Sequence, residues 1–334
     1  MDENTILEVK GLKKYFPINE GFWNRTESYV KAVNDISFSI KTGQTFGLVG
    51  ESGCGKTTSA RLIMRALELT DGQVLFRRNN GEIVNLAELD KYELKIVRQD
   101  IQMVFQDPYS SLNPRMPVLE LIAEPLKAYG WKKKRYKERV AELLDLVGLD
   151  VKYMPRYPHA FSGGQRQRIG IARALALNPS LVVADEPVSA LDVSVQAQIL
   201  NLLRDLQERM GLTYLFIAHD LSVIRYICDK IAVMYLGRLV EIAETDKLFN
   251  NPLHPYTATL LSSVPVPDPM EDWLAVRVEG EISDSSKGIE GCSFAARCQY
   301  AVDECGELEQ KLVDIDGHQV ACHRYEELNL EGVE

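Results

Sequence analysis

The sequence has no long hydrophobic run, and this argues against a membrane-spanning helix. In its 334 residues, no apolar stretch approaches the roughly 20 residues that a membrane-spanning helix requires. The acidic start, Met1-Asp2-Glu3-Asn4, has neither the positive charge nor the apolar core of a signal peptide. We therefore expect a protein that stays in the cytosol and reaches a membrane only through protein partners.

A concentrated basic surface is also missing. The net charge is −10, and from residue 266 to the end there are 17 acidic and 5 basic residues. The one basic cluster, Lys132-Lys133-Lys134-Arg135, continues into a helical pattern and is interpreted as a solvated helix face. Because nucleic-acid-binding proteins carry a concentrated basic face, this distribution argues against nucleic acid as a partner.

Cysteine is scarce before the tail, and the tail lacks the short spacing of a zinc site. Four of the six cysteines lie there, at Cys292, Cys298, Cys305 and Cys322. In a reducing cytosol, clustered thiols indicate a bound metal more than disulfides. Zinc sites usually have C-x₂₋₄-C spacings, which do not occur here, so zinc is disfavoured. Unliganded thiols in a small packed tail remain an alternative.

One strong pattern is present, the phosphate-binding sequence G-x-x-x-x-G-K-[ST]. It consists of Gly50, Glu51, Ser52, Gly53, Cys54, Gly55, Lys56 and Thr57. The apolar run at 45–49 predicts a strand before it, and residues 59–67 predict a helix after it. Glycines let backbone N–H groups surround an anion, and the helix N-terminus adds its positive dipole end. We predict a nucleotide site in which Lys56 reaches the β- and γ-phosphates and Thr57 ligates Mg²⁺.

Further polar residues follow predicted apolar strands. The strand at 181–184 ends in Asp185-Glu186, and the strand at 215–218 ends at His219. Buried carboxylates are costly unless compensated, so we expect Mg²⁺ at Asp185 and a water molecule at Glu186. Since ligands bind at the carboxyl ends of parallel strands, His219 should face the same crevice.

A second glycine-rich helix start lies at Phe161-Ser162-Gly163-Gly164-Gln165, before a helix predicted over 166–175. It is suited to an anion for the same reasons as the first. Alternation of apolar and polar residues predicts strands at 6–16 and 33–40, and we also expect strands at 71–76 and 101–106, with a polar hairpin around 79–81. Residues 107–114 contain prolines that exclude helix and sheet. Helical periodicity runs throughout 118–148.

Together these residues resemble the nucleotide-binding subunit of an ATP-binding cassette (ABC) transporter, and the resemblance covers essentially the whole chain. The Walker A loop is 50–57, the Q-loop glutamine is Gln106, and the signature is 161–165. Walker B is 181–186, the D-loop is 189–192, and the switch histidine is His219. The signature begins with Phe161 instead of the commoner leucine, a change outside its Ser-Gly-Gly core.

Other stretches resemble one group within that superfamily, the oligopeptide and dipeptide importer ATPases. These are Asp107–Arg115, Tyr157–Ala160 and His254-Pro255-Tyr256-Thr257. Pro187-Val188-Ser189 and Lys14–Pro17 are similar to the second of that importer's two ATPase subunits. The implied function is ATP hydrolysis that drives peptide uptake.

Three alternatives to peptide uptake can be compared with the sequence. Similar systems move nickel or other small solutes. A soluble ABC protein of DNA repair or translation usually has a coiled-coil insertion or two cassettes, and this chain has one cassette and no long heptad run. A P-loop kinase has no use for the Ser-Gly-Gly-Gln signature.

The resemblance implies an α/β fold with a P-loop NTPase core, an antiparallel β subdomain, a helical subdomain inserted at about 107–160, and a small Cys-containing C-terminal domain. The nucleotide-binding domain would cover 1–245 and the C-terminal region 246–334. Some relatives hold a [4Fe–4S] cluster on four tail cysteines, which Cys292, Cys298, Cys305 and Cys322 match.

The resemblance also implies roles for single residues. ATP would contact Tyr15, Phe16, the loop from Gly50 through Thr58, and Asp192, although Tyr15 and Phe16 also suit simple packing. Mg²⁺ would lie on Thr57, Gln106 and Asp185. Glu186 would be the general base, and His219 and Gln106 would complete the catalytic set.

The implied partners are all proteins. Ser162, Gly163, Gly164 and Gln165 of one subunit would close over the γ-phosphate of ATP on another. The partners are thus a second homologous ATPase subunit in a head-to-tail dimer, two transmembrane permease subunits and, indirectly, an extracellular substrate-binding protein. The expected location is the cytoplasmic face of the cell membrane.

Overall fold

The chain forms two compact units, each assembled from separate segments. The computed structural model describes residues 1–19, 26–107, 109–263 and 291–332. The first unit comprises Met1–Leu7, Ile40–Thr45 and Leu75–Ala218, and the second comprises Glu8–Ser39, Phe46–Val74 and His219–Glu334. Four of the boundaries between the units fall inside strands, namely β1 (Thr5–Asn19), β2 (Thr26–Lys41), β3 (Thr45–Val49) and β4 (Asp71–Arg77). The last boundary lies between Ala218 and His219.

The core of the first unit is a parallel sheet in the order β8-β7-β6. Its strands are β6 (Ile101–Val104), β7 (Leu181–Asp185) and β8 (Thr213–Ile217), and every residue of β7 and β8 is buried. Val104 pairs with Ala184, and Asp185 pairs with Ile217, so the three strands end at the same edge. Such fully apolar strands are typical of parallel sheets that are covered on both faces. The register brings the residues after β6 and β7 to one edge of the sheet.

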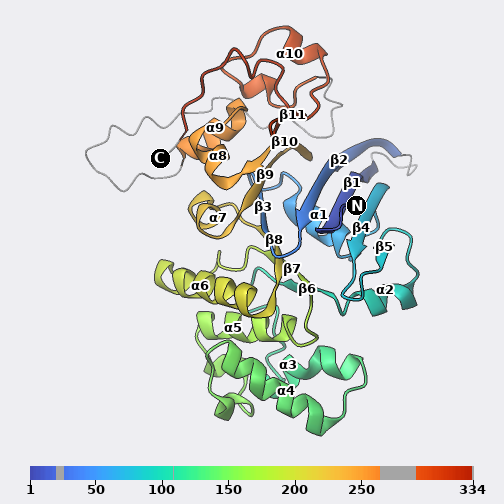
Figure 1. Cartoon of the computed structure of the whole chain (residues 1–334), viewed down its shortest axis with the longest axis vertical. Helices are drawn as coiled ribbons and strands as arrows, with labels where there is room; N and C mark the ends of the chain where they lie inside the picture. The colour runs from blue at the N-terminus through green and yellow to red at the C-terminus, as the bar shows by residue number, and fades with distance from the viewer. Residues whose placement is uncertain (20–25, 108, 264–290, 333–334) are drawn as a thin grey trace. The chain divides into compact units, whose positions relative to one another are not determined.

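Helices make up much of the rest of the first unit. Figure 1 shows α3 (Val118–Ala128), α4 (Lys133–Leu146) and α5 (Gly163–Ala174) gathered in green, and α5 also packs against α6 (Val193–Met210) and β6. Two short 3₁₀ turns, η1 (Val151–Tyr153) and η2 (Pro158–Ala160), connect α4 to α5. The apolar residues Val140, Leu143, Leu144 and Val147, which recur with helical periodicity, are buried. Among the described residues, no helix is both long and apolar enough to cross a membrane.

The helical region predicted over 118–148 is confirmed, and it consists of two helices. The chain leaves α3 after Ala128 and begins α4 only at Lys133. Gly130 has φ +77°, a left-handed conformation that ends helices and that glycine adopts without strain. The apolar periodicity on both sides hid a break that this single glycine marks. The strand predicted over 101–106 is likewise shorter, because β6 ends at Val104 and the side chain of Phe105 is 48% exposed.

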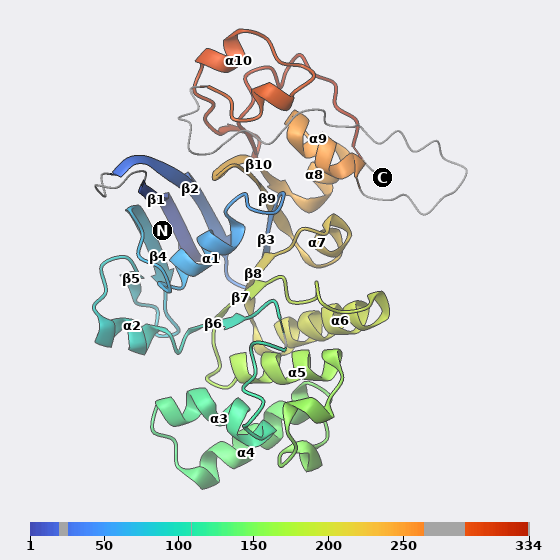
Figure 2. The same ribbon diagram turned by 180° about the vertical axis from the view of Figure 1, so that it is seen from behind.

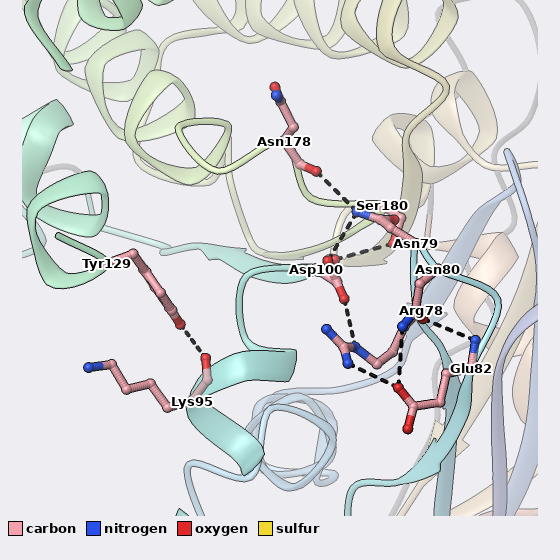
Figure 3. Close-up of polar contacts among 9 residues, drawn as sticks. All are labelled: Arg78, Asn79, Asn80, Glu82, Lys95, Asp100, Tyr129, Asn178 and Ser180. Atoms are coloured by element: carbon pink, nitrogen blue, oxygen red, sulfur yellow. Dashed lines mark hydrogen bonds and ion pairs between the residues drawn. The ribbon is translucent and has the colours of Figure 1, made fainter. Parts of the chain in front are cut away.

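A polar network holds the amino ends of β6 and β7 in the first unit (Figure 3). The carboxylate of Asp100 accepts hydrogen bonds from Arg78 Nε and Asn79 Nδ2, each at 3.0 Å. The carbonyl oxygen of Asp100 accepts from the backbone N–H of Ser180 at 2.9 Å. Arg78 and Asn79 belong to the turn of the β4–β5 hairpin, with β5 at Ile83–Asn85, so the predicted polar hairpin is confirmed. The short helix α2 (Lys91–Val97) follows the hairpin, and Tyr129 donates to the carbonyl of Lys95.

The second unit contains a mixed sheet in the order β11-β12-β10-β9-β3. Strand β3 pairs in parallel with β9 (Lys230–Tyr235), and β9 forms an antiparallel hairpin with β10 (Arg238–Glu244). The tail adds β12 (His318–Val320) and β11 (Val313–Ile315) beyond β10. Within this unit, β2, β1 and the first part of β4 lie side by side in another sheet, in that order. The mixture of parallel and antiparallel strands agrees with the predicted α/β fold class.

The helices of the second unit are short. They are α1 (Lys56–Ile63), α7 (Leu221–Ile227), α8 (Thr245–Asn250), α9 (Pro255–Ser262), α10 (Glu304–Glu307) and the 3₁₀ turn η3 (Ala295–Arg297). Figure 2 shows α8 and α9 close together in orange.

A buried carboxylate joins the tail to the sheet. Glu241 on β10 is fully buried and accepts from the backbone N–H groups of Leu253 and His254 at 2.8 and 2.9 Å. His318 Nε2 on β12 lies 2.6 Å from the same carboxylate. Burial lowers the pKa of His254 to about 3, so its ring is neutral, and Nδ1 accepts from the backbone N–H of Tyr256 at 3.1 Å. These contacts fix the start of α9 and the tail hairpin on β10.

Candidate functional site

The phosphate loop links β3 to α1 and needs glycine for steric reasons. Gly50, Gly53 and Gly55 have φ angles of +148°, +82° and +111°. A Cβ at Gly50 would lie 2.1 Å from the carbonyl oxygen of Met234, and one at Gly55 would lie 2.2 Å from that of Ala32. The backbone of the loop is thus packed directly against neighbouring backbone, which no larger residue permits.

Lys56 lies inside this loop. Its ammonium group donates to the carbonyl oxygens of Gly50 at 2.8 Å and of Glu51 at 2.9 Å, and its side chain is buried. Helix α1 begins at Lys56 itself, and Gly55 at its N-cap contributes no side-chain cap. A buried cation next to the N-terminus of a helix favours binding of a phosphate group. Burial raises the pKa of Cys54 in the same loop, so this thiol is uncharged at neutral pH.

In the first unit, two predicted catalytic side chains are in contact. Gln106 Nε2 donates to Glu186 Oε2 at 2.8 Å. Glu186 directly follows β7, and its backbone N–H donates to the carbonyl of Ile217 at 2.9 Å. It has φ +46°, which is costly for a residue with a side chain and is typical of functional positions. The end of β7 therefore fixes the direction of the Glu186 side chain.

The predicted magnesium ligands can be judged by the type of their donor atoms. Asp185, the last residue of β7, is 4% exposed. The amide nitrogen of Gln106 is used by Glu186, so its amide oxygen is the atom that would face a cation. A carboxylate, an amide oxygen and the hydroxyl of Thr57 are the hard oxygen ligands that Mg²⁺ prefers. The set fits the ion chemically.

The signature residues form a capped helix start in the first unit. The Ser162 hydroxyl accepts from the backbone N–H of Gln165, and Gln165 Oε1 accepts from the N–H of Ser162 at 3.2 Å. A Cβ at Gly164 would lie 2.4 Å from Val195 Cγ1, so glycine allows α5 to approach α6 closely. The predicted glycine-rich helix start is present, with Gly163 as its first helical residue.

The remaining predicted site residues have local roles of their own. Asp192 caps α6 by accepting from Val195 N–H at 3.0 Å and from the Ser194 hydroxyl at 2.7 Å, which lowers its pKa. The hydroxyl of Tyr15 lies 2.7 Å from the side-chain amide of Asn34. Phe16 is 38% exposed, beneath the ammonium of Lys14. His219 is exposed and begins the last of the three segments of the second unit.

Four tail cysteines line one pocket in the second unit. Cys292, Cys298, Cys305 and Cys322 surround it together with His254, Phe294 and Arg324. All four are free thiols, and burial raises the pKa of Cys322 to about 11. Within the described ranges, no group of three or more His, Cys, Asp or Glu side chains is arranged to hold a metal ion.

One of the four sulfurs accepts a backbone hydrogen bond, since the N–H of Val302 donates to Cys305 Sγ at 3.4 Å. Burial raises the pKa of Cys292, Cys298 and Cys322, and the nearby backbone N–H groups offset this only in part. Hydrogen bonds of this kind stabilise thiolates and tune clusters bound to them. The pocket therefore gathers four thiols, one of which already accepts such a hydrogen bond.

Sequence reasoning missed one part of the phosphate loop's surroundings. The Glu51 carboxylate accepts from Arg297 Nη1 and Nη2 at 2.9 and 3.0 Å. The backbone N–H of Glu51 donates to the Tyr256 hydroxyl at 2.9 Å. Tyr256 belongs to the His-Pro-Tyr-Thr stretch, which the sequence indicated only as a point of resemblance. No local sequence pattern singles out Arg297.

Fold and loop geometry define the class of protein, a P-loop ATPase of the cassette type. A solved dimer of the ATP-binding cassette MJ0796, described as a post-hydrolysis state bound to ADP and Pi, is similar with a TM-score of 0.62 and 30% identity, covering 72% of this chain and 99% of that one. The structure of cbiO1 from Clostridium perfringens is similar with a TM-score of 0.62 at 26% identity, over 74% of this chain and 91% of that one.

Sequence comparisons narrow the class. Residues 33–189 match the family described as ABC transporter, and residues 240–305 match the oligopeptide/dipeptide transporter C-terminal region. The chain is 51% identical to the oligopeptide transport ATP-binding protein AppF of Bacillus subtilis, over 97% of this chain and 98% of that protein. It is 47% identical to OppF of Escherichia coli, over 97% of each. The chain belongs to the ABC transporter family, among the ATP-binding subunits, and is an ATPase.

Proposed function

We propose that this chain hydrolyses ATP to drive uptake of peptides through membrane partner subunits. The observation that carries the proposal is similarity along the full chain to proteins named as oligopeptide transport ATP-binding proteins, together with the matching C-terminal region. The partners would be a second homologous ATPase subunit, two permease subunits and, indirectly, an extracellular binding protein. The location would be the cytoplasmic face of the membrane, and the domain division would follow 1–245 and 246–334.

The phosphate loop would bind the triphosphate of ATP. The ammonium of Lys56 now bonds to two carbonyl oxygens of the loop, and it would turn to the β- and γ-phosphates. Thr57, Gln106 and Asp185 would hold Mg²⁺, which would offset phosphate charge when bound. The remaining loop residues through Thr58 would donate backbone N–H groups, and Tyr15 or Phe16 would stack on the adenine.

Glu186 would act as the general base. It would take a proton from the water that attacks the γ-phosphorus, while the bond from that phosphorus to the oxygen bridging to ADP breaks. Gln106 holds one carboxylate oxygen of Glu186 and would keep the base in position. His219 would contact the γ-phosphate. Ser162 to Gln165 of a second ATPase subunit would complete the site, with Asp192 of that second subunit nearby. Because the bound ATP would then join the two subunits, its hydrolysis would allow them to separate.

The transported solute can be tested in the assembled transporter. We expect that the chain, copurified with its permease subunits and placed in vesicles with the binding protein, hydrolyses ATP several-fold faster when peptides are added. Peptides of two to six residues are compared with Ni²⁺ and with buffer, and a Glu186→Gln chain serves as the inactive control. Stimulation of ATP hydrolysis by Ni²⁺ but not by peptides would indicate that the transporter carries a metal ion. Full hydrolysis by a chain that never associates with a permease would favour a soluble ABC ATPase.

We further propose that Cys292, Cys298, Cys305 and Cys322 hold a [4Fe–4S] cluster. Support comes from the shared pocket and from the N–H of Val302, which donates to Cys305 Sγ at 3.4 Å. A single ion draws its sulfur ligands to within about 2.3 Å of itself. Within the described residues the thiols are not arranged around one ion, and four thiolates are the ligand set that a [4Fe–4S] cluster takes.

Iron analysis tests this proposal. Protein prepared without oxygen should be brown and contain about four irons per chain, the number in a [4Fe–4S] cluster. Cys322→Ala should lose most of the iron, whereas Cys228→Ala, which changes a buried cysteine outside the pocket, should keep it. A colourless, iron-free anaerobic preparation of the unchanged chain contradicts the proposal.

A further inference from the structure

The phosphate loop contains an acidic side chain, Glu51, where a polyphosphate would bind. A carboxylate beside an anion site is unfavourable unless a cation offsets its charge. Arg297 provides that cation through two parallel hydrogen bonds to the carboxylate, at 2.9 and 3.0 Å. This forked geometry is specific to arginine and is among the strongest of charged contacts. The charge of Glu51 is thus neutralised from a position 246 residues further along the chain.

Arg297 is itself fixed by its surroundings. Its side chain is 9% exposed, and its guanidinium lies 5.7 Å from the ring of Tyr235 and 5.9 Å from that of Phe294. Its Nη1 also lies 3.3 Å from the Tyr235 hydroxyl. A buried guanidinium with cation–π contacts has little freedom to move, so its partner Glu51 is held in one place.

The backbone of Glu51 is held by a second residue of the C-terminal region. Tyr256 is fully buried, with its ring against those of Tyr235 and Phe294 at centroid distances of 4.6 and 5.3 Å. Its hydroxyl accepts the backbone N–H of Glu51 at 2.9 Å. The carbonyl oxygen of Glu51 accepts a hydrogen bond from the ammonium of Lys56. Side chain, N–H and carbonyl of Glu51 therefore connect the C-terminal region to the phosphate-binding lysine.

We propose that Arg297 and Tyr256 are positioning residues of the nucleotide site, which hold and neutralise Glu51 so that the phosphate loop accepts ATP. The affinity for ATP then depends on the C-terminal region, although neither residue need touch the nucleotide. This inference rests on the proposed function in one respect, that ATP binds at the phosphate loop.

The test measures the affinity of the full chain for ATP with Mg²⁺ by calorimetry. Arg297→Gln leaves Glu51 as an unpaired carboxylate, and we expect the dissociation constant to rise about tenfold. The double variant Glu51→Gln/Arg297→Gln removes both charges, and we expect it to bind ATP more tightly than Arg297→Gln alone. Lys311→Gln is the matched control, since Lys311 is an exposed cation of the same region and pairs with Glu309 at 3.6 Å. It should bind ATP like the unchanged chain.

The recovery in the double variant separates positioning from general stability. If Arg297 only stabilised the fold, the double variant would bind ATP no better than Arg297→Gln does. Tyr256→Phe removes one hydroxyl and keeps the packed ring. This variant therefore tests the contact with the phosphate loop even if Arg297→Gln fails to fold. We expect it to bind ATP about threefold more weakly than the unchanged chain. Unchanged affinity in both Arg297→Gln and Tyr256→Phe overturns the inference. Failure of the unchanged chain to bind ATP would instead overturn the proposed function.

Discussion

Replacing Lys56 by alanine should weaken ATP binding about 100-fold, a loss of ~2.7 kcal/mol. The side chain is buried in the loop, where its ammonium bonds to the carbonyl oxygens of Gly50 and Glu51. Its removal takes away the positive charge that the phosphates require and leaves those two carbonyls without this donor. Calorimetry with ATP and Mg²⁺ measures the change in affinity.

The control for this prediction is Lys133→Ala, which removes the same charge from an exposed position at the start of α4. It should leave the affinity for ATP unchanged. Circular dichroism establishes that both variants are folded. An affinity of Lys56→Ala equal to that of Lys133→Ala would remove Lys56 from the proposed site.

Replacing Glu186 by glutamine should separate ATP binding from ATP hydrolysis. The amide has nearly the same shape but cannot take a proton from water, so we expect kcat to fall about 1,000-fold. The affinity for ATP should stay within about twofold, because the loop is unaltered. Phosphate release from the assembled transporter measures turnover, and calorimetry measures binding.

Glu208→Gln on α6 is the matched control, since it makes the same change at an exposed position of the same unit. Normal turnover is expected there. Undiminished hydrolysis by Glu186→Gln would show that another group activates the water. A simultaneous loss of ATP binding would indicate that Glu186 has a role in shaping the site.

Local patterns predicted most of the fold. The apolar runs before Asp185 and before His219 are buried strands, and the apolar stripe on α4 faces the interior. The glycines of the phosphate loop have the positive φ angles that their pattern requires. These features depend on neighbours in sequence, and periodicity and turn chemistry describe such neighbours well.

The errors arose where the pattern continued past a local break. Helical periodicity over 118–148 did not show the break at Gly130 between α3 and α4, and the apolar Phe105 extended the predicted strand beyond Val104, where β6 ends. Helix α2 was missed, although its capping box of Asp90 and Glu93 gives a local signal.

Contacts between distant segments could not be predicted from the sequence. The tail hairpin pairs with β10, and Arg297 reaches Glu51, because the fold brings together segments that have no shared local pattern. A single sequence shows that such residues are present but not which of them meet. The His-Pro-Tyr-Thr stretch illustrates this, since only the structure connects Tyr256 to the phosphate loop.

Calorimetric titration of the unchanged full chain with ATP in the presence of Mg²⁺ tests the central claim, that the loop from Gly50 to Thr57 binds the nucleotide. We expect saturable binding with one ATP per chain, and loss of that binding in Lys56→Ala. Absence of any measurable heat of binding from the folded chain, at ATP concentrations up to several millimolar, would contradict the account.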